Sequence, residues 1–154
     1  MTPAIVALNK AGIEHVVHSY EHDPSAAFGN DAANKLEIAP ELVFKTLIVS
    51  TGDGFAVAVI PVSTSLNLKL VATELSSKRV VMADSSAAER ITGYLVGGIS
   101  PIKQKKRLKT LIDVSAQDFE TVFISAGRRG LEIELSAKSL QQVTDATFCD
   151  LTAL

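Results

Sequence analysis

The sequence predicts a mixed α/β fold of the α+β kind: one domain with a curved mixed sheet or partial barrel, flanked by helices. Apolar, strand-like segments occur both as hairpins and directly after helical segments. This arrangement indicates a sheet with antiparallel or mixed pairing and helices on its outside. The chain of 154 residues has the length of one domain and contains no linker or internal repeat. We therefore assign residues 1–154 to a single domain.

Composition excludes several classes of protein. The formal net charge is −2, so the average field does not attract nucleic acid, and any contact with RNA needs a local patch. No apolar run approaches the ~20 residues that cross a bilayer, and the N-terminus lacks a signal-peptide pattern, which predicts a cytoplasmic protein. The one cysteine, Cys149, excludes an internal disulfide framework and is expected to be a small buried hydrophobic residue.

The first half of the chain contains clear signals for the starts and ends of helices and strands. Thr2 before Pro3 is typical of a helix N-cap, and Gly12 ends the apolar stripe that follows. Asn30 or Asp31 is expected to cap the second helix. The elements expected here are a helix over 3–11, a strand over 14–20, a helix over 29–36, a buried strand over 43–50, an antiparallel partner over 55–62 and a helix over 66–75.

In the second half, Asp84 is expected to cap a helix that ends before Gly93. Ser136 is expected to cap a closing helix with Leu140 and Val143 facing inward. The strand over 131–135 alternates, so that Glu132 and Glu134 share the face opposite its leucines. The other elements expected are strands over 79–82, 108–113 and 121–125, and a glycine-bounded turn over 126–130.

The central feature of the sequence is a turn with the adjacent glycines Gly97 and Gly98, closed by Pro101. Such a turn requires positive φ or lets another group approach its N–H groups. It is either a tight connection between packed strands or a site for a carbonyl oxygen or phosphate. Cations follow the turn at Lys103, Lys105, Lys106, Arg107 and Lys109, and a second group lies at Arg128 and Arg129. These cations form either a solvated face or a contact surface for RNA.

Three groups of polar residues fall at strand ends or turns, where one cleft can collect them. They are Tyr20 with Lys45, the Gly97–Gly98 turn, and Ser125 with Arg128, Arg129 and Glu132. Lys45 lies at the mouth of a buried strand, either as a surface lysine or as an ammonium at the rim of a pocket. His15, His18 and His22 do not predict a metal site, because no cysteine or acidic cluster completes a ligand set.

These motifs resemble a known family. Residues 20–23 (Tyr-Glu-His-Asp), 45–47 (Lys-Thr-Leu), 93–101 and 125–131 are similar, in this order, to the YbaK (EbsC) family of aminoacyl-tRNA deacylases. That family is similar to the editing domain inserted in bacterial prolyl-tRNA synthetases. The resemblance extends from Met1 to about Phe148 and covers nearly the whole chain.

The resemblance implies a curved-sheet α/β fold and removal of a wrongly attached amino acid, typically cysteine, from proline tRNA. No cofactor or metal is implied, and prolyl-tRNA synthetase is a possible partner. Glu132 stands where the family has aspartate. In the family, the lysine that matches Lys45 is tied most closely to activity, and Tyr20, Thr46, Gly98 and Ser125 match other positions of the pocket. From these matches, together with the polar groups and cations described above, we expect Lys45 and Gly98 to be catalytic, Tyr20, Thr46, Gly97, Ser125, Arg128 and Glu132 to bind substrate, and Lys103, Lys105, Lys106, Arg107 and Arg129 to bind tRNA.

The residues agree with this chemistry. An aminoacyl ester is already activated, so its hydrolysis needs positioning and stabilisation of an oxyanion more than a strong nucleophile. We expect the Gly97–Gly98 backbone to contact the carbonyl oxygen and Lys45 to contact the terminal phosphate or ribose. The attacking group is the substrate's thiol, a tRNA hydroxyl or water. Two alternatives remain: a deacylase for another small amino acid such as alanine, and a non-catalytic module that binds tRNA or a synthetase.

Overall fold

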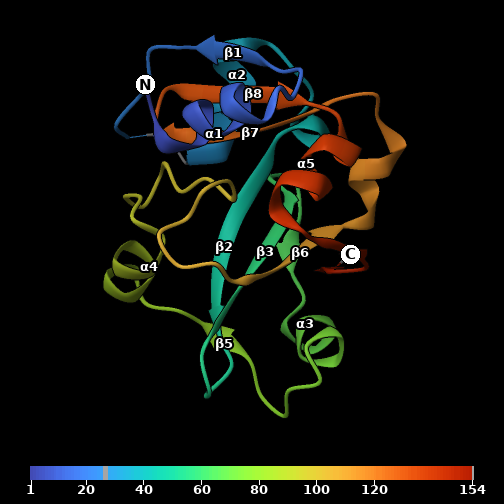
Figure 1. Cartoon of the computed structure of the whole chain (residues 1–154). Helices are drawn as coiled ribbons and strands as arrows, with labels where there is room; N and C mark the ends of the chain where they lie inside the picture. The colour runs from blue at the N-terminus through green and yellow to red at the C-terminus, as the bar shows by residue number, and fades with distance from the viewer. Residues whose placement is uncertain (26–27, 154) are drawn as a thin grey trace.

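The computed structural model describes residues 1–25 and 28–153, and Figure 1 shows how its elements are arranged. Five α-helices and ten strands are present in this part of the chain. The helices are α1 (Pro3–Ala11), α2 (Phe28–Leu36), α3 (Leu68–Glu74), α4 (Ser85–Thr92) and α5 (Ala137–Thr144), with short 3₁₀ segments η1 (Pro40–Leu42) and η2 (Val114–Asp118). The strands are β1 (Val16–Ser19), β2 (Phe44–Ser50), β3 (Phe55–Pro61), β4 (Ser65–Leu66), β5 (Val81–Met82), β6 (Lys109–Asp113), β7 (Val122–Arg128), β8 (Leu131–Leu135), β9 (Thr147–Cys149) and β10 (Thr152–Ala153).

The strands form two main sheets. A five-stranded mixed sheet has the order β5-β2-β3-β6-β9. Strand β2 is antiparallel to both β5 and β3, whereas β6 is parallel to β3 and to β9. A three-stranded antiparallel sheet has the order β1-β8-β7, and β10 pairs with β4. A parallel bridge joins Val43, the residue before β2, to Phe123 of β7. The predicted α+β domain with mixed sheets is therefore confirmed, and the described strands do not close into a barrel.

The expected caps place several helices correctly. The hydroxyl of Thr2 accepts a hydrogen bond from the Ile5 N–H at 3.3 Å, and Gly12 ends α1 in the left-handed conformation. Asp84 caps α4 by accepting from the Ala87 N–H at 2.7 Å, and Gly93 ends that helix with φ +80°. Ser136 caps α5. The first, fourth and last helices predicted from the sequence are therefore confirmed.

Two sequence-based expectations are wrong in detail. Helix α2 begins at Phe28, so Asn30 and Asp31 lie inside it, and the Asp31 carboxylate accepts from the Asp23 N–H instead of capping. Strand β7 continues to Arg128, so the turn expected over 126–130 contains only Arg129 and Gly130. A register shift between Ser125 and Arg128 allows this extension, because a bulge lets the strand bend while it keeps its partner.

The main core lies between the sheets and helices α1 and α5. Leu131, Ile133 and Leu135 of β8 are in this core, as expected for the apolar face of an alternating strand. A second core lies under α3, where Val71 packs with β2 and β3, and it includes the buried Cys149. The predicted burial of Cys149 is thus confirmed, and burial raises the pKa of its thiol to about 11.

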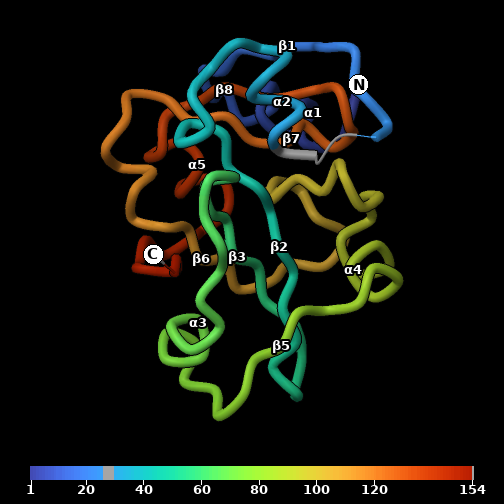
Figure 2. Tube along the Cα trace, turned by 180° about the vertical axis from the view of Figure 1, so that it is seen from behind, coloured from blue at the N-terminus to red at the C-terminus, as the bar shows by residue number. Residues whose placement is uncertain are grey.

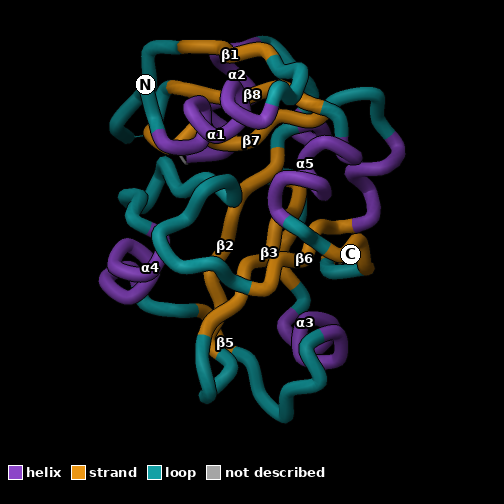
Figure 3. The backbone as a smooth tube through the Cα atoms, in the orientation of Figure 1, coloured by secondary structure: helices purple, strands orange, loops and turns teal. Residues whose placement is uncertain are grey.

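The views from opposite sides show how these parts surround one region. The three-stranded sheet and α1 lie at one end of β2, while α4 lies beside the middle of the same strand (Figures 1 and 2). The connection from α4 to β6 is a long loop, drawn in teal, that passes across β2 (Figure 3). No helix of the described residues is long and apolar enough to span a membrane.

Candidate active site

One cavity of about 380 Å³ lies where β2, the loop after α4 and the three-stranded sheet meet. Its wall contains both polar groups and apolar side chains, as is typical of small-molecule sites. The lining residues are Tyr20, Asn30, Ala32, Val43, Phe44, Lys45, Thr46, Leu47, Ile48, Val62, Met82, Ala83, Ser85, Ala88, Val96, Gly97, Ile99, Ser125 and Glu132.

The cavity brings together residues that are far apart in the sequence. Of the eight residues expected from the sequence for catalysis or substrate binding, six line this cavity: Tyr20, Lys45, Thr46, Gly97, Ser125 and Glu132. Gly98, although it follows Gly97 in the chain, and Arg128 do not line the cavity. The expected single cleft therefore exists, and it contains part of each of the three predicted groups.

Lys45 and Thr46 line the cavity from β2, a strand with a partly open edge. Strand β5 pairs only with Val49 and Ser50, and the Ala83 N–H donates to the Ile48 carbonyl at 3.0 Å. In an antiparallel strand, alternate residues direct both main-chain groups to the same side. The N–H and C=O of Thr46 therefore point to the same outer edge as those of Ile48, where the described residues provide no pairing strand. This edge offers main-chain donors and acceptors to a ligand.

The loop that carries the two glycines is held at both ends. The Tyr94 hydroxyl donates to the Ile102 carbonyl at 2.6 Å, and burial raises its pKa to about 12. The Val96 N–H donates to the Glu89 carboxylate at 2.8 Å. Gly97 has φ +94°, which explains the requirement for glycine there. The loop thus presents Gly97 to the cavity in a fixed position.

Gly98 has a different role from the one expected. Its N–H donates to the Leu95 carbonyl at 2.9 Å, so this donor is already used within the turn. A Cβ placed on Gly98 would lie 2.5 Å from the Arg128 Cα and 2.7 Å from the Arg129 N. The glycine is therefore required where the loop and strand β7 touch backbone to backbone.

The most unusual group in the cavity is Glu132, of which only 6% is exposed. The alternation of β8 puts it opposite Ser125 on the face away from the main core. Burial raises the pKa of its carboxyl to about 8, because the charged form loses its hydration. The prediction that Glu132 and Glu134 share a face is confirmed. Sequence alternation alone did not predict that the first of them would be buried.

Tyr20 and Ser125 flank this carboxyl. The Tyr20 N–H donates to the Gly130 carbonyl at 2.9 Å, which fixes the residue just beyond β1. Burial and then the neighbouring charge of Glu132 raise the pKa of the Tyr20 hydroxyl, so it stays protonated and can donate. The Ser125 hydroxyl accepts from the Gly127 N–H at 3.1 Å in the bulge of β7, and its own hydrogen remains available to a ligand.

Arg128, at the end of β7, and Arg129, in the turn that follows, have different surroundings. Arg128 is exposed. The side chain of Arg129 is only 16% exposed; it donates to the Asp23 carbonyl and lies 3.6 Å from the buried Asp31 carboxylate. Arg129 therefore connects the turn to α2 and to the segment after Tyr20. This position makes it a support of the cavity wall more than a free surface cation.

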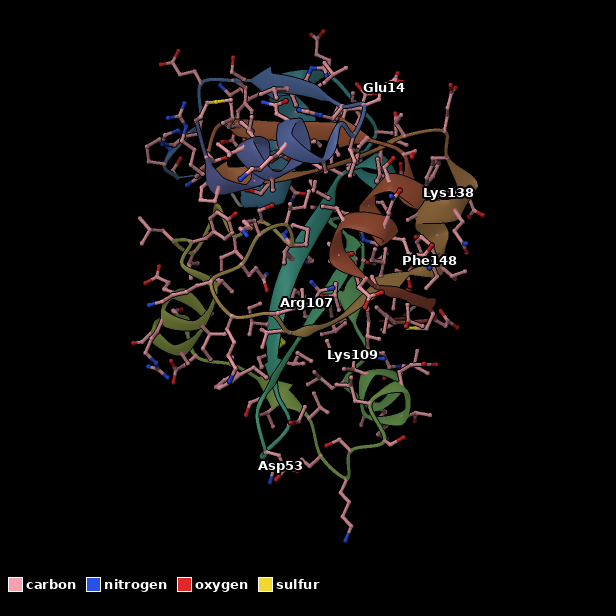
Figure 4. The ribbon with its side chains drawn as sticks, in the orientation of Figure 1. Glu14, Asp53, Arg107, Lys109, Lys138 and Phe148 are labelled. Atoms are coloured by element: carbon pink, nitrogen blue, oxygen red, sulfur yellow. The ribbon has the colours of Figure 1, made fainter. Side chains whose placement is uncertain are left out.

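The basic segment, which we define as residues 103–107, lies along the end of α4. The main-chain N–H groups of Lys105 and Lys106 donate to the Thr92 and Ile91 carbonyls, at 2.8 and 3.0 Å. Lys103, Lys105, Lys106 and Arg107 are all exposed. Arg107 lies on the loop that crosses β2, whereas Lys109 lies at the start of β6 (Figure 4). The segment thus presents cations on the same loop that carries Gly97.

Comparisons with known proteins agree on the family. A model of the aminoacyl-tRNA editing domain matches residues 22–143. Over 121 residues the chain is 38% identical to the Enterococcus faecalis protein named "Putative Cys-tRNA(Pro)/Cys-tRNA(Cys) deacylase EbsC", covering 78% of this chain and 74% of that protein. The chain belongs to the aminoacyl-tRNA editing domain family. The resemblance seen in the sequence motifs is thereby confirmed.

Solved structures show that the fold of this editing domain is shared. A structure described as "a putative trans-editing enzyme for prolyl tRNA synthetase" matches with a TM-score of 0.86 and 19% identity, over 99% of this chain and 96% of that one. The hypothetical protein APE2540 matches with a TM-score of 0.88 and 22% identity, over 99% and 100%. At these identities the likeness establishes the mixed α+β fold alone.

Part of the cavity of this editing domain was not foreseen from the sequence. Met82, Ser85 and Ala88 line it from β5 and α4, and Asn30 lines it from α2. These residues stand in ordinary helix and strand patterns, and only the tertiary packing of β5, α4 and α2 around β2 brings them to the site. Within the described residues, no group of three or more His, Cys, Asp or Glu side chains is arranged to hold a metal ion.

Proposed function

We propose that this protein is a trans-editing aminoacyl-tRNA deacylase that hydrolyses cysteinyl-tRNA(Pro). The observation that supports this most is the cavity that gathers Tyr20, Lys45, Thr46, Ser125 and Glu132 beside a fixed glycine loop. The family, and the deacylase named among its relatives, supports the same reaction. The substrate is an ester that joins an amino acid to the terminal ribose of tRNA.

Two main-chain donors are suited to the ester carbonyl. They are the N–H of Gly97, in the loop, and the N–H of Thr46, on the open edge of β2. The Gly98 N–H is not assigned this role, because it donates to Leu95. Donors fixed in advance stabilise the negative charge that develops on the carbonyl oxygen during attack. They provide this stabilisation without any movement of the backbone.

Lys45 supplies the positive charge at the cavity. It lines the cavity, and no ion pair to it is found within the described part of the chain. We assign its ammonium to the terminal phosphate or ribose of the tRNA, where it holds the ester against the carbonyl donors. Lys45 is a positioning residue for the RNA end of the substrate in this proposal.

The reaction adds a nucleophile to the ester carbonyl and expels the ribose oxygen, which takes up a proton. With water as nucleophile, the products are the free amino acid and tRNA with a free 3′ end. With the cysteine thiol as nucleophile, a cyclic thioester leaves the tRNA and water hydrolyses it afterwards. Both routes need the same oxyanion donors and no nucleophile from the protein.

The tRNA itself is assigned to the exposed cations Lys103, Lys105, Lys106, Arg107 and Arg128, with Arg129 in support of the wall. A small cavity reads little of the tRNA identity, so we propose that prolyl-tRNA synthetase presents the substrate, in the cytoplasm where aminoacylation occurs.

The test is a deacylation assay of the purified protein on cysteinyl-, alanyl- and prolyl-tRNA(Pro). We expect fast hydrolysis of the cysteinyl ester and little of the prolyl ester. Faster hydrolysis of the alanyl ester would replace cysteine by alanine in this proposal. If all three esters decayed at the rate found without protein, the deacylase function would be refuted.

A further inference from the structure

Two polar groups in the cavity lack a partner. Among the described residues, the buried Glu132 side chain makes no hydrogen bond or ion pair, and the Thr46 Oγ1 is buried without a hydrogen-bond partner. Buried polar atoms are nearly always satisfied in native proteins, and a buried charge without a partner is costly. Two such groups in one cavity indicate that a ligand group satisfies them.

The cations near Glu132 do not satisfy it. Arg129 is directed to Asp31 and to the Asp23 carbonyl. Lys45 lines the same cavity but lies beyond the 4.0 Å limit of an ion pair with Glu132. The cavity therefore has a positive group and a separate acidic group that are not paired with each other. A ligand suited to it carries both signs of charge, with a positive group at the acidic end.

We propose that Glu132 and the Thr46 hydroxyl bind the α-ammonium group of the aminoacyl ester, so that the site selects esters whose amino group is free. This inference rests on the proposed deacylase function and names what that site recognises. The α-ammonium is the one positive group of an aminoacyl-tRNA end with a neutral side chain. It is one carbon away from the ester carbonyl, so a site that holds the ammonium also places the carbonyl.

This recognition excludes N-acylated esters. An acylated nitrogen carries no charge, so it would leave the acidic group unpaired in a desolvated wall, and its acyl group would need space beside Glu132. A site built to hydrogen-bond a substrate group rejects analogues that lack the group, because its own buried polar atoms are left unsatisfied. Peptidyl-tRNA, in which the nitrogen is acylated, is thereby protected from this enzyme.

Protons provide an independent signature of the same contact. Burial raises the pKa of the Glu132 carboxyl to about 8 in the free protein, so it holds a proton at pH 6.5. An ammonium beside the carboxyl favours the charged form, and the proton leaves when the ligand binds. Binding of a ligand with a free amino group should therefore release close to one proton per site, and an N-acetyl ligand should release none.

The experiment measures binding, without catalysis. The ligands are 3′-amino-3′-deoxyadenosine joined to cysteine through an amide, and the same compound with an N-acetyl group. Calorimetry in buffers of different ionisation enthalpy gives the Kd and the number of protons released. The proteins are the wild type, Glu132→Gln, and Glu134→Gln as a matched control. Glu134 is on the same face of β8 but already accepts hydrogen bonds from Thr121 and His18.

We expect the wild type to bind the free-amino ligand about 10- to 100-fold more tightly than the N-acetyl ligand, the range for a hydrogen bond to a charged group. Glu132→Gln should reduce this ratio to about three or less and abolish proton release, while Glu134→Gln keeps both. If Glu132→Gln does not fold, the shape-conserving Thr46→Val takes its place and should lower the ratio severalfold.

Equal binding of the two ligands by the wild type would overturn this proposal, as would a preference that survives intact in Glu132→Gln. So would failure of the wild type to bind the free-amino ligand. Neither ligand has an ester, so these outcomes are independent of deacylation, which the assay on charged tRNA tests separately. A deacylase that hydrolyses N-acetyl-cysteinyl-tRNA as fast as cysteinyl-tRNA would keep the proposed function and lose this inference.

Discussion

Gly98 and Arg128 touch backbone to backbone: a Cβ on Gly98 would lie 2.5 Å from the Arg128 Cα. Real Cβ atoms are essentially never found so close to another backbone atom, so an alanine would push the glycine loop away from β7. This contact holds Gly97 and Ser125 against the same cavity, from a loop and a strand that are remote in sequence.

Gly98→Ala should therefore destabilise the protein by roughly 1–3 kcal/mol, as overpacking against rigid neighbours does, and should also lower deacylation. Gly54→Ala is the matched control, because nothing lies within 4 Å of a Cβ there. Urea unfolding of both variants measures the effect. Equal stability of the two variants would show that the loop can shift at no cost, contrary to the structure.

Burial of Glu132 should make the stability of the free protein fall with rising pH. The folded-state pKa is about 8, above the ordinary value of 4.5. Between these values the folded protein holds a proton that the unfolded chain has lost, so the free energy of unfolding falls by up to about 1.4 kcal/mol per pH unit from this group. The fall stops above about pH 8.

Glu132→Gln should remove this slope and raise stability at alkaline pH. Glu134→Gln should keep the slope, because hydrogen bonds from Thr121 and His18 lower the pKa of the Glu134 carboxyl and its contribution is lost only in acid. Urea unfolding at about pH 5, 7 and 9 measures both. The same pH profile in wild type and Glu132→Gln would contradict the buried acidic group.

The two neighbouring arginines should differ in what their loss does. Arg129→Ala breaks a contact with the buried Asp31 and should cost roughly 2–4 kcal/mol of stability. Arg128→Ala removes an exposed cation and should change stability by less than about 0.5 kcal/mol. Thermal unfolding of both variants checks this. If Arg128→Ala lowered the thermal stability more than Arg129→Ala, the assignment of Arg129 as the residue that supports the cavity wall would be wrong.

The basic segment should affect tRNA binding and not the chemical step. Changing both Lys105 and Lys106 to alanine should raise KM and leave kcat nearly unchanged, because a phosphate contact is the same in the ground and transition states. The dependence of log KM on log salt should become shallower by about 1.5, as two phosphate contacts are lost. The paired control, Lys69→Ala with Lys78→Ala, changes exposed lysines on and after α3. An unaltered salt dependence in the Lys105 and Lys106 double variant would assign the RNA to another face.

Local signals in the sequence were sufficient for much of the fold. Thr2, Asp84 and Ser136 mark their helices because capping is determined by neighbouring residues. Asn30 was misread as a cap, since the start of α2 lies two residues earlier. Strand β9 escaped prediction because it is three residues long and pairs with β6 across a large separation in sequence. Short non-local pairings leave no periodic pattern.

The site was predictable in its residues more than in their roles. The motifs that contain Tyr20, Lys45 and Ser125 were identified from family resemblance, and the cavity joins them. The sequence did not reveal that Gly98 faces Arg128, because close approach of two backbones depends on tertiary packing. The burial of Glu132 likewise depends on the tertiary packing that forms the cavity wall, and alternation along the strand specifies only its face.

The most direct measurement is the rate of cysteinyl-tRNA(Pro) hydrolysis by Lys45→Ala, with Lys109→Ala as control. Both are lysines of strands, but Lys45 lines the cavity and Lys109 is exposed at the start of β6 (Figure 4). The account predicts that Lys45→Ala keeps a native circular dichroism spectrum and loses about 10²-fold or more in kcat/KM, while Lys109→Ala stays within about a few-fold of the wild type. A folded Lys45→Ala variant that hydrolysed the ester at the wild-type rate would contradict the assignment of this cavity as the deacylase site.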